Sequence, residues 1–174
     1  MVCGGGAAAD VVRLIDAATA RGWTVDVTAT RSAIEFIDAA EIARASGRPV
    51  RTTYKFAPDG TRISPPADAL IIAPATFNTI NKLAAGIADT YALSSVADVI
   101  GRGVPTVVVP AVNEALAARR PFRQALDDLR AEGVRVLFGP ADGWLPGVTE
   151  FPWIKALELA EGLTMVDRDA AMRP

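Results

Sequence analysis

The chain has 174 residues, 51% of them apolar, and a formal net charge of −2 at pH 7. This length and apolar content suffice for one substantial core, so we predict a single domain over residues 1–174. The low net charge argues against partners such as nucleic acid or an anionic membrane, which a basic surface normally attracts.

The histidine and cysteine counts restrict the chemistry further. The sequence has no histidine and a single cysteine, Cys3. Histidine is therefore excluded as a metal ligand and as a proton shuttle, and we predict neither an intrachain disulfide nor a metal site. No basic leader precedes an apolar core, and no apolar run approaches the roughly 20 residues that span a bilayer. A soluble, cytoplasmic protein is the expectation.

Short β-branched runs alternate with alanine-rich stretches along the chain, a pattern typical of parallel strands joined by crossover helices. The predicted strands cover residues 24–29, 69–73, 105–110 and 134–139. The predicted helices are Ala8–Ala20, Ser32–Ala45, Asn78–Ala85, Leu93–Ile100, Phe122–Glu132 and Trp153–Glu161. We therefore predict an α/β fold with a doubly wound parallel sheet.

Two segments depart from this pattern. Only Met1, Val2 and Cys3 precede the first glycine, fewer than the five or six residues of an ordinary strand, which suggests a start assigned too late or a trimmed edge. Residues 47–66, "GRPVRTTYKFAPDGTRISPP", contain a Pro-Asp-Gly turn and a Pro-Pro pair. We expect a loop or short hairpin there, carrying a partner or substrate contact.

The stretch "CGGGAAAD" at residues 3–10 precedes the first helix and has the relaxed dinucleotide spacing Gly4-x-Gly6-x-x-Ala9. Glycines permit a tight turn and a close backbone approach, and a helix N-terminus presents free N–H groups to an anion. Gly4, Gly5 and Gly6 therefore form either a phosphate site or a plain strand-to-helix turn.

The stretch "TATRSA" at residues 28–33 distinguishes between cofactors. An NAD site usually has Asp or Glu here, whereas this chain has Thr28, Thr30, Arg31 and Ser32. Hydroxyl groups at a helix start suit a terminal phosphate better than a ribose diol. Two alternatives stay open: an NADP site with Arg31 on the 2′-phosphate, or Thr30 or Ser32 as a plain helix cap.

The stretch "PATFNT" at residues 74–79 follows a central strand, and doubly wound sheets bind ligands at the carboxyl ends of their strands. We expect this loop to deliver the Pro74 turn, backbone N–H groups and the Thr76 hydroxyl to that crevice. The Asn78 amide carries donors and an acceptor, so it can orient a ring edge or a carboxylate without charge.

These motifs resemble the homo-oligomeric flavin-containing cysteine decarboxylases. "PATFNT" is similar to the family motif Pro-Ala-Ser-Ala-Asn-Thr, and "KLAAGIAD" at residues 82–89 to the segment after it. "VCGGGAA" at residues 2–8 is similar to the phosphate turn Val-Thr-Gly-Ser-Ile-Ala-Ala, and "TRSAIEFI" at residues 30–37 to the next helix start. "VPAVNEAL" at residues 109–116 resembles Pro-x-Met-Asn-x-x-Met-Trp and retains Asn113.

The resemblance implies a flavodoxin-like or Rossmann-like three-layer sandwich with non-covalently bound FMN. By position, the phosphate end would meet Gly4, Gly5, Thr30 and Ser32. Phe36 would lie near the ring, although a Phe at this spacing is as readily a core residue. Ala75, Thr76 and Asn78 would line the flavin edge. The family's flavin commonly lies where subunits of a trimer meet, so a homo-oligomer, a trimer or a multiple of trimers, is also implied.

The chain departs from the family where catalysis is expected. Arg62 or Gly60 falls where the decarboxylases have a histidine, and the lid region reads "FGPADGW" at residues 138–144, without cysteine. Loss of a positioned acid or base costs about 10²–10⁴-fold in rate, so we do not expect cysteine decarboxylation by the usual route.

We expect instead an FMN-dependent oxidation or oxidative decarboxylation of a small acid or a peptide-derived substrate. Asn78 and Asn113 would hold the substrate's carboxylate or carbonyl group, and Arg62, Tyr54 or Lys55 would supply charge or a proton. The alternatives are a non-catalytic flavin-binding or accessory protein and an NADP-dependent oxidoreductase. The small, sparsely charged residues 76–100 fit either a subunit interface or a buried pair of core helices.

Overall fold

The computed structural model describes residues 1–63, 66–145 and 150–171. The predicted Pro-Pro pair thus lies partly outside the described residues. The helices are η1 (Gly6–Asp10), α1 (Val12–Ala20), η2 (Arg31–Glu35), α2 (Ala39–Ser46), α3 (Phe77–Ala84), α4 (Tyr91–Gly101), α5 (Glu114–Ala117), α6 (Arg120–Ala131), η3 (Pro140–Asp142) and α7 (Trp153–Ala171). The strands are β1 (Lys55–Phe56), β2 (Arg62–Ile63), β3 (Leu70–Ala75), β4 (Thr106–Pro110) and β5 (Arg135–Val136).

The central sheet is parallel and doubly wound. Strand β4 lies between β3 and β5. On the other side of β3, the Met1 carbonyl accepts from the Ala73 N–H at 3.0 Å, and parallel bridges join Val2 to Ala29 and Thr28 to Arg51. The order across the sheet is therefore residue 51, residues 28–29, residues 1–3, β3, β4 and β5. Chain order reverses between residues 1–3 and β3, and this switch point is where such sheets bind ligands.

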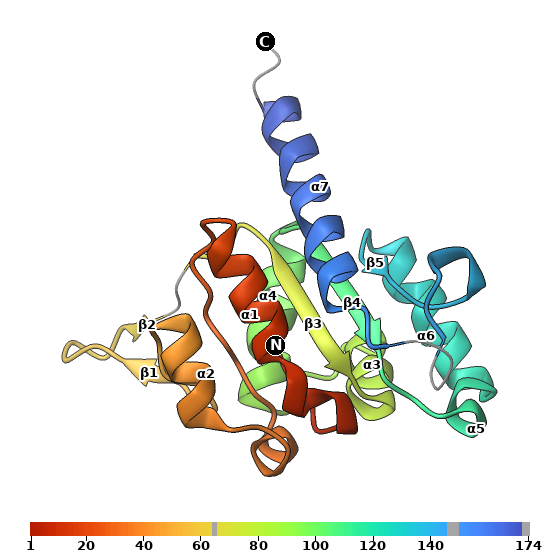
Figure 1. Cartoon of the computed structure of the whole chain (residues 1–174), viewed down its shortest axis with the longest axis horizontal. Helices are drawn as coiled ribbons and strands as arrows, with labels where there is room; N and C mark the ends of the chain where they lie inside the picture. Colours follow the sequence, from red (N-terminus) through yellow and green to blue (C-terminus); the bar gives the residue numbers. More distant parts are fainter. Residues whose placement is uncertain (64–65, 146–149, 172–174) are drawn as a thin grey trace.

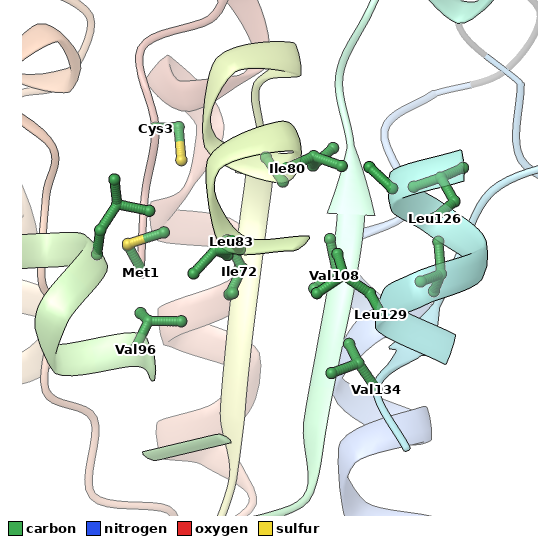
Figure 2. Packing of buried hydrophobic residues seen from close by; sticks show 14 of the residues in the cluster. Met1, Cys3, Ile72, Ile80, Leu83, Val96, Val108, Leu126, Leu129 and Val134 are labelled. Atoms are coloured by element: carbon green, nitrogen blue, oxygen red, sulfur yellow. The ribbon is translucent and has the colours of Figure 1, made fainter. Parts of the chain in front are cut away.

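Helices cover the sheet on both faces, which confirms the predicted three-layer α/β sandwich. Helices α1, α2 and α7 contribute to a buried cluster that contains Val2, Ala73 and Val107. The opposite face is covered by α3, α4 and α6. Figure 2 shows Ile80 and Leu83 of α3 and Leu129 of α6 packed against the strand residues of that face. Figure 1 shows α7 extending well beyond the edge of the sheet.

Two predicted strands are shorter than the sequence indicated. Strands 69–73 and 105–110 are confirmed as β3 and β4, but the predicted strand 134–139 is reduced to Arg135–Val136. Residues 24–29 form only the isolated bridges at Thr28 and Ala29. Residues 1–3 meet this segment only at residues 28–30, where the Val2 N–H donates to the Thr28 carbonyl and the Thr30 N–H to the Val2 carbonyl, so the ladder is too short for a regular strand.

Three predicted helices have different bounds. The first begins as the 3-10 helix η1 before α1. The predicted helix Ser32–Ala45 is broken, because the Asp38 carboxylate accepts from the N–H groups of Ala40 and Glu41 and so starts α2 afresh. The last helix continues past Glu161 to Ala171.

The irregular segment after residue 47 contains the predicted hairpin. Strands β1 and β2 pair antiparallel, with Phe56 opposite Arg62, around the turn at Asp59 and Gly60. Figure 1 shows this hairpin projecting from the body of the molecule beside α2. Within the described ranges, none of the helices has the length and apolar character needed to cross a bilayer.

Candidate functional site

Four segments meet along the carboxyl edge of the sheet, here called the carboxyl rim: residues 3–6, 30–32, 74–78 and 111–113. The Thr30 N–H donates to the Val2 carbonyl at 3.0 Å, and the Cys3 N–H to the Pro74 carbonyl at 3.1 Å. The Ala111 N–H donates to the Ala75 carbonyl at 2.8 Å. The switch point therefore brings together most of the residues that the motifs predicted.

The glycine turn is open on one side and tightly packed on the other. A Cβ on Gly4 would lie 2.7 Å from the Ser32 carbonyl oxygen, so this position accommodates only glycine. A Cβ on Gly5 or Gly6 would meet no atom within 4 Å. Among the described residues, the N–H groups of residues 4–7 make no backbone hydrogen bond, so they are available to an anion.

Two hydroxyl groups lie beside this turn. The Oγ atoms of Thr30 and Ser32 are 3.3 Å apart. Thr30 is the N-cap residue of η2, but its side chain makes no capping hydrogen bond, so the cap alternative is wrong for Thr30. Arg31 is exposed at the start of η2. Thr28 is placed elsewhere: it lines a cavity at the opposite, amino edge of the sheet.

A buried hydroxyl network supports the rim from below. Thr76 caps α3, and its hydroxyl lies 3.1 Å from that of Thr79. The Cys3 thiol donates to the Thr79 hydroxyl at 3.3 Å. Burial raises the pKa of the Cys3 thiol, so this group stays protonated and acts as a donor. Sequence reasoning missed Thr79; the Thr-x-x-Thr spacing at a helix start was the available signal.

The two candidate asparagines differ in whether their side chains already make hydrogen bonds within the protein. Asn78 is exposed on the first turn of α3, and its side chain makes no hydrogen bond to any residue the structure describes. Asn81, one turn later, donates its amide to the Phe77 carbonyl at 2.7 Å. Asn113 caps α5 through its Oδ1, which accepts from the Leu116 N–H at 2.9 Å. The Asn78 amide is therefore free for a ligand, whereas Asn113 has only its NH₂ group left.

The remaining candidates lie around the rim or on the hairpin. Phe36 is 44% exposed at the end of η2, so the core alternative for this ring is wrong. Pro74, which follows a cis peptide bond, and Ala75 are buried, so Ala75 presents its backbone rather than a side chain. On the hairpin, the Tyr54 ring packs edge-on against Tyr91 with centroids 4.8 Å apart.

The other hairpin candidates are less constrained. Lys55 is exposed, and the backbone of Arg62 pairs with that of Phe56. No group of three or more metal-ligating side chains occurs in the described part of the chain.

The rim as a whole suits a phosphorylated ligand with an apolar ring system. Free backbone N–H groups and neighbouring hydroxyls bind phosphate oxygens without a full positive charge. The exposed side chains of Ile34 and Phe36, in η2 and just after it, offer apolar contact. Asn78 adds a neutral donor and acceptor for a ring edge.

Comparison with protein families is decisive for the class of protein. The model of the family described as Flavoprotein matches residues 1–157. The chain belongs to the Flavoprotein family. The resemblance found in the sequence motifs is thereby confirmed at the level of the family.

Curated relatives of this Flavoprotein chain are longer proteins, and the chain matches a part of each. It is 32% identical over 154 residues to the coenzyme A biosynthesis bifunctional protein CoaBC of Mycolicibacterium smegmatis, covering 87% of this chain and 36% of that protein. It is 29% identical over 147 residues to the Escherichia coli K12 protein of the same name, covering 82% and 35% respectively. The chain thus spans about a third of the length of these relatives.

Solved structures share the fold over almost the whole chain. The FMN-dependent cysteine decarboxylase TvaF from thioviridamide biosynthesis has a TM-score of 0.71 and 24% identity, with 94% of each chain covered. A PPC decarboxylase mutant complexed with pantothenoylaminoethenethiol has a TM-score of 0.69 and 19% identity, with 95% of each chain covered. Identities this low support the fold alone.

Proposed function

We propose that this Flavoprotein chain binds FMN at the carboxyl rim. The observation that carries the proposal is the set of free N–H groups at residues 4–7 beside the Thr30 and Ser32 hydroxyls, at the switch point of the sheet. These groups would hold the phosphate. Phe36 would contact the ring system, and Asn78, with the backbone of Ala75 and Thr76, would bind its polar edge. The structurally similar proteins TvaF and SpaF are FMN-dependent cysteine decarboxylases, which supports this cofactor.

The reaction we propose is an oxidation or oxidative decarboxylation of a small acid or a peptide-derived substrate. Bound FMN supplies a two-electron acceptor, which is the chemistry that a flavin brings to a protein. The chain's own residues bind and orient the substrate: the free Asn78 amide donates to its carboxylate or carbonyl oxygen, and the NH₂ group of Asn113 adds a second donor.

Proton transfer in this reaction has to proceed without histidine, since the sequence has none. This observation favours a second candidate function, a flavin-binding or accessory protein that does not turn over substrate. The two functions differ in one measurable property, which is whether a substrate reduces the bound flavin.

We also propose that the chain is a homo-oligomer in which a second copy completes the site. Exposed apolar side chains occur beside the rim at Ile34 and Phe36, on the hairpin at Phe56 and Ile63, and after α3 at Ile87. In the proposed oligomer, contacts between subunits would bury these side chains. A single species of monomer mass in light scattering at micromolar concentration would contradict this assembly.

The visible spectrum of the purified protein tests the cofactor, and anaerobic reduction tests the reaction. We expect flavin absorbance that persists through gel filtration after incubation with FMN, and no displacement of FMN by NADPH. Bleaching of the flavin by a thiol acid or a cysteine-terminated peptide would support the enzyme. Retained colour with every such substrate would support the non-catalytic candidate, and a colourless protein would contradict both.

A further inference from the structure

Three arginines lie together where α5 ends and α6 begins: Arg119, Arg120 and Arg123, here called the arginine cluster. All three are exposed. Arg123 donates to the Ala118 carbonyl at 2.7 Å, and within the described chain the other two side chains make neither a hydrogen bond nor an ion pair. Most other arginines with described side chains pair with a carboxylate, namely Arg13, Arg21, Arg48, Arg51, Arg102, Arg130 and Arg135. The cluster is therefore a concentration of positive charge without an acidic partner among the described residues.

The position of the arginine cluster on α6 is electrostatically unfavourable. Arg119 is the N-cap of α6, Arg120 is its first residue, and the first turn contains no acidic residue. A helix N-terminus carries partial positive charge, so it favours acidic side chains and disfavours cations. Arg119 also makes no capping hydrogen bond, as Ser, Thr, Asp or Asn would. Departures of this kind from the rules of local stability are expected at functional positions.

Two connections place the arginine cluster beside the carboxyl rim. Asn113 of the rim caps α5, and the six-residue step from Asn113 to Arg119 spans about 10 Å at the helical rise. On the side of α3, the rings of Phe77 and Phe122 stack with centroids 5.9 Å apart, and Phe77 directly precedes Asn78. The first turn of α6 therefore lies against the first turn of α3. Both asparagines that we propose as substrate ligands are near neighbours of the cluster.

We propose that the arginine cluster binds an acidic stretch of a peptide substrate whose reacting end reaches Asn78 and Asn113. Residues three or four apart on a helix have Cβ atoms about 5–6 Å apart, and Arg123 has this spacing from both Arg119 and Arg120. Alternate side chains of an extended peptide are separated by about 6–7 Å. Carboxylates at alternate peptide positions therefore reach two arginines at once. The role of this peptide as a substrate rests on the proposed function, whereas its binding does not.

The expected affinity is low, and this decides what the arginine cluster can do. One exposed ion pair contributes little, because both partners stay hydrated and salt screens them. Two or three pairs formed by one peptide add, and arginine can bind a carboxylate through two parallel N–H bonds. We therefore expect a dissociation constant of about 1 mM at low ionic strength. Such an affinity selects among substrates without retaining the product.

An NMR titration of the isotope-labelled chain without flavin tests the binding. The two probes are acetyl-Glu-Gly-Glu-Gly-Glu-amide and its neutral match acetyl-Gln-Gly-Gln-Gly-Gln-amide. We expect the acidic peptide to shift the signals of Arg119, Arg120 and Arg123 saturably and to bind at least about tenfold more tightly than the neutral peptide. Addition of 0.2 M NaCl should weaken it by about threefold or more. Equal binding of the two peptides, or no binding of either, would overturn the proposal.

Matched variants show whether the cluster itself or the net charge is responsible. Arg120→Gln/Arg123→Gln should weaken the acidic peptide by about fivefold or more. The control, Arg44→Gln/Arg102→Gln, removes the same charge from exposed arginines elsewhere and should stay within about twofold of the native chain. Equal losses in the two variants would overturn the assignment to the cluster. Complete displacement of the peptide by equimolar inorganic phosphate would assign the cluster to phosphate instead.

Thermal unfolding distinguishes a binding role from a structural one. Arg120→Glu should raise the Tm by about 1–3 °C, because a negative charge at the start of α6 complements the helix dipole. The same variant should lose the acidic peptide. A Tm that falls on this change would show that Arg120 stabilises the fold, which contradicts the unfavourable electrostatics inferred for the cluster.

A nitroxide label locates the reacting end of the bound peptide. Acetyl-Glu-Gly-Glu-Gly-Cys, labelled on its thiol, should broaden the side-chain amide signals of Asn78 and Asn113. The backbone signal of Thr24, which lines the cavity at the amino edge, should stay sharp. Binding at the cluster with both asparagine signals unbroadened would overturn the substrate role. These readouts need no flavin, so failure of FMN to bind would contradict the proposed function and leave them unchanged.

Discussion

Gly4 lies in direct backbone contact with Ser32. A Cβ added to Gly4 would fall 2.7 Å from the Ser32 carbonyl oxygen and 2.9 Å from its Oγ. This contact joins the turn after the first strand to the start of η2, and it holds the free N–H groups beside the two hydroxyls. The packing of the rim therefore requires glycine at position 4, whether or not a ligand is bound.

The first prediction concerns these glycines. Gly4→Ala should lower the free energy of unfolding by about 1–3 kcal/mol, because the added methyl forces two backbone segments apart. Gly5→Ala is the matched control: its Cβ points into open space and its φ of −165° suits any residue. Urea unfolding should show little change for Gly5→Ala, and equal losses for the two variants would contradict the contact.

The second prediction concerns the network below the rim. Thr79→Val removes the hydroxyl that accepts from Cys3 and contacts Thr76, and should cost about 1–2 kcal/mol of stability because buried polar groups lose their partner. Adding Cys3→Ala to Thr79→Val should cost less than Cys3→Ala alone in the native background. Strict additivity of the two changes in a denaturation cycle would show that the thiol and hydroxyl do not interact.

The third prediction separates the two roles of Asn113. Asn113→Ala should cost about 1 kcal/mol of stability through loss of the α5 cap, and Asn113→Ser should restore most of it. If the amide also binds substrate, Asn113→Ser should still raise the substrate KM several-fold. Full recovery of KM in the serine variant would leave Asn113 with the capping role alone.

The fourth prediction is a pH dependence of stability. Burial lowers the pKa of the Met1 ammonium group from 8.0 to about 6. Between these values the unfolded chain binds a proton that the folded chain releases, so stability should rise from pH 6 to pH 8, by about 2 kcal/mol. No histidine titrates in this window. The charged side chains that line the cavity beside Met1 are Asp26, Asp68, Asp98, Arg48, Arg51 and Arg102.

Acetylation of the Met1 nitrogen provides the control for this pH dependence. The acetylated chain has no ammonium group to bury, so its urea midpoint should vary much less between pH 6 and pH 8. A midpoint of the free chain that is flat across the window, or one that falls as the pH rises, would show that the ammonium group is not desolvated as described.

The sequence was sufficient for the elements that carry strong local patterns. The apolar runs of β3 and β4 and the amphipathic α6 were predicted within a few residues, because burial on both faces or on one face leaves a clear periodicity. The motifs also located Gly4, Ser32 and Asn78 at the rim. These positions follow from strand ends and helix starts, which turn residues signal directly.

Other features depend on contacts that a pattern does not contain. The pairing of residues 24–29 depends on which backbone segments lie beside them. The predicted helix Ser32–Ala45 does not reveal that Asp38 starts a new helix. Gly162 lies inside α7, where packing outweighs the low helix propensity of glycine. The structure was likewise needed to show that Asn113 caps α5, and that the Asn78 side chain makes no hydrogen bond to a described residue.

Equilibrium titration with FMN and with riboflavin, followed by quenching of flavin fluorescence, tests the central claim most directly. The two ligands share the ring system and differ in the phosphate that residues 4–7, Thr30 and Ser32 would bind. We predict that FMN binds at least about tenfold more tightly than riboflavin, since charge-assisted hydrogen bonds to a phosphate contribute about 1.5–3 kcal/mol each. Asn78→Ala should weaken both ligands equally. Equal affinity for FMN and riboflavin, or no binding of either, would contradict the account.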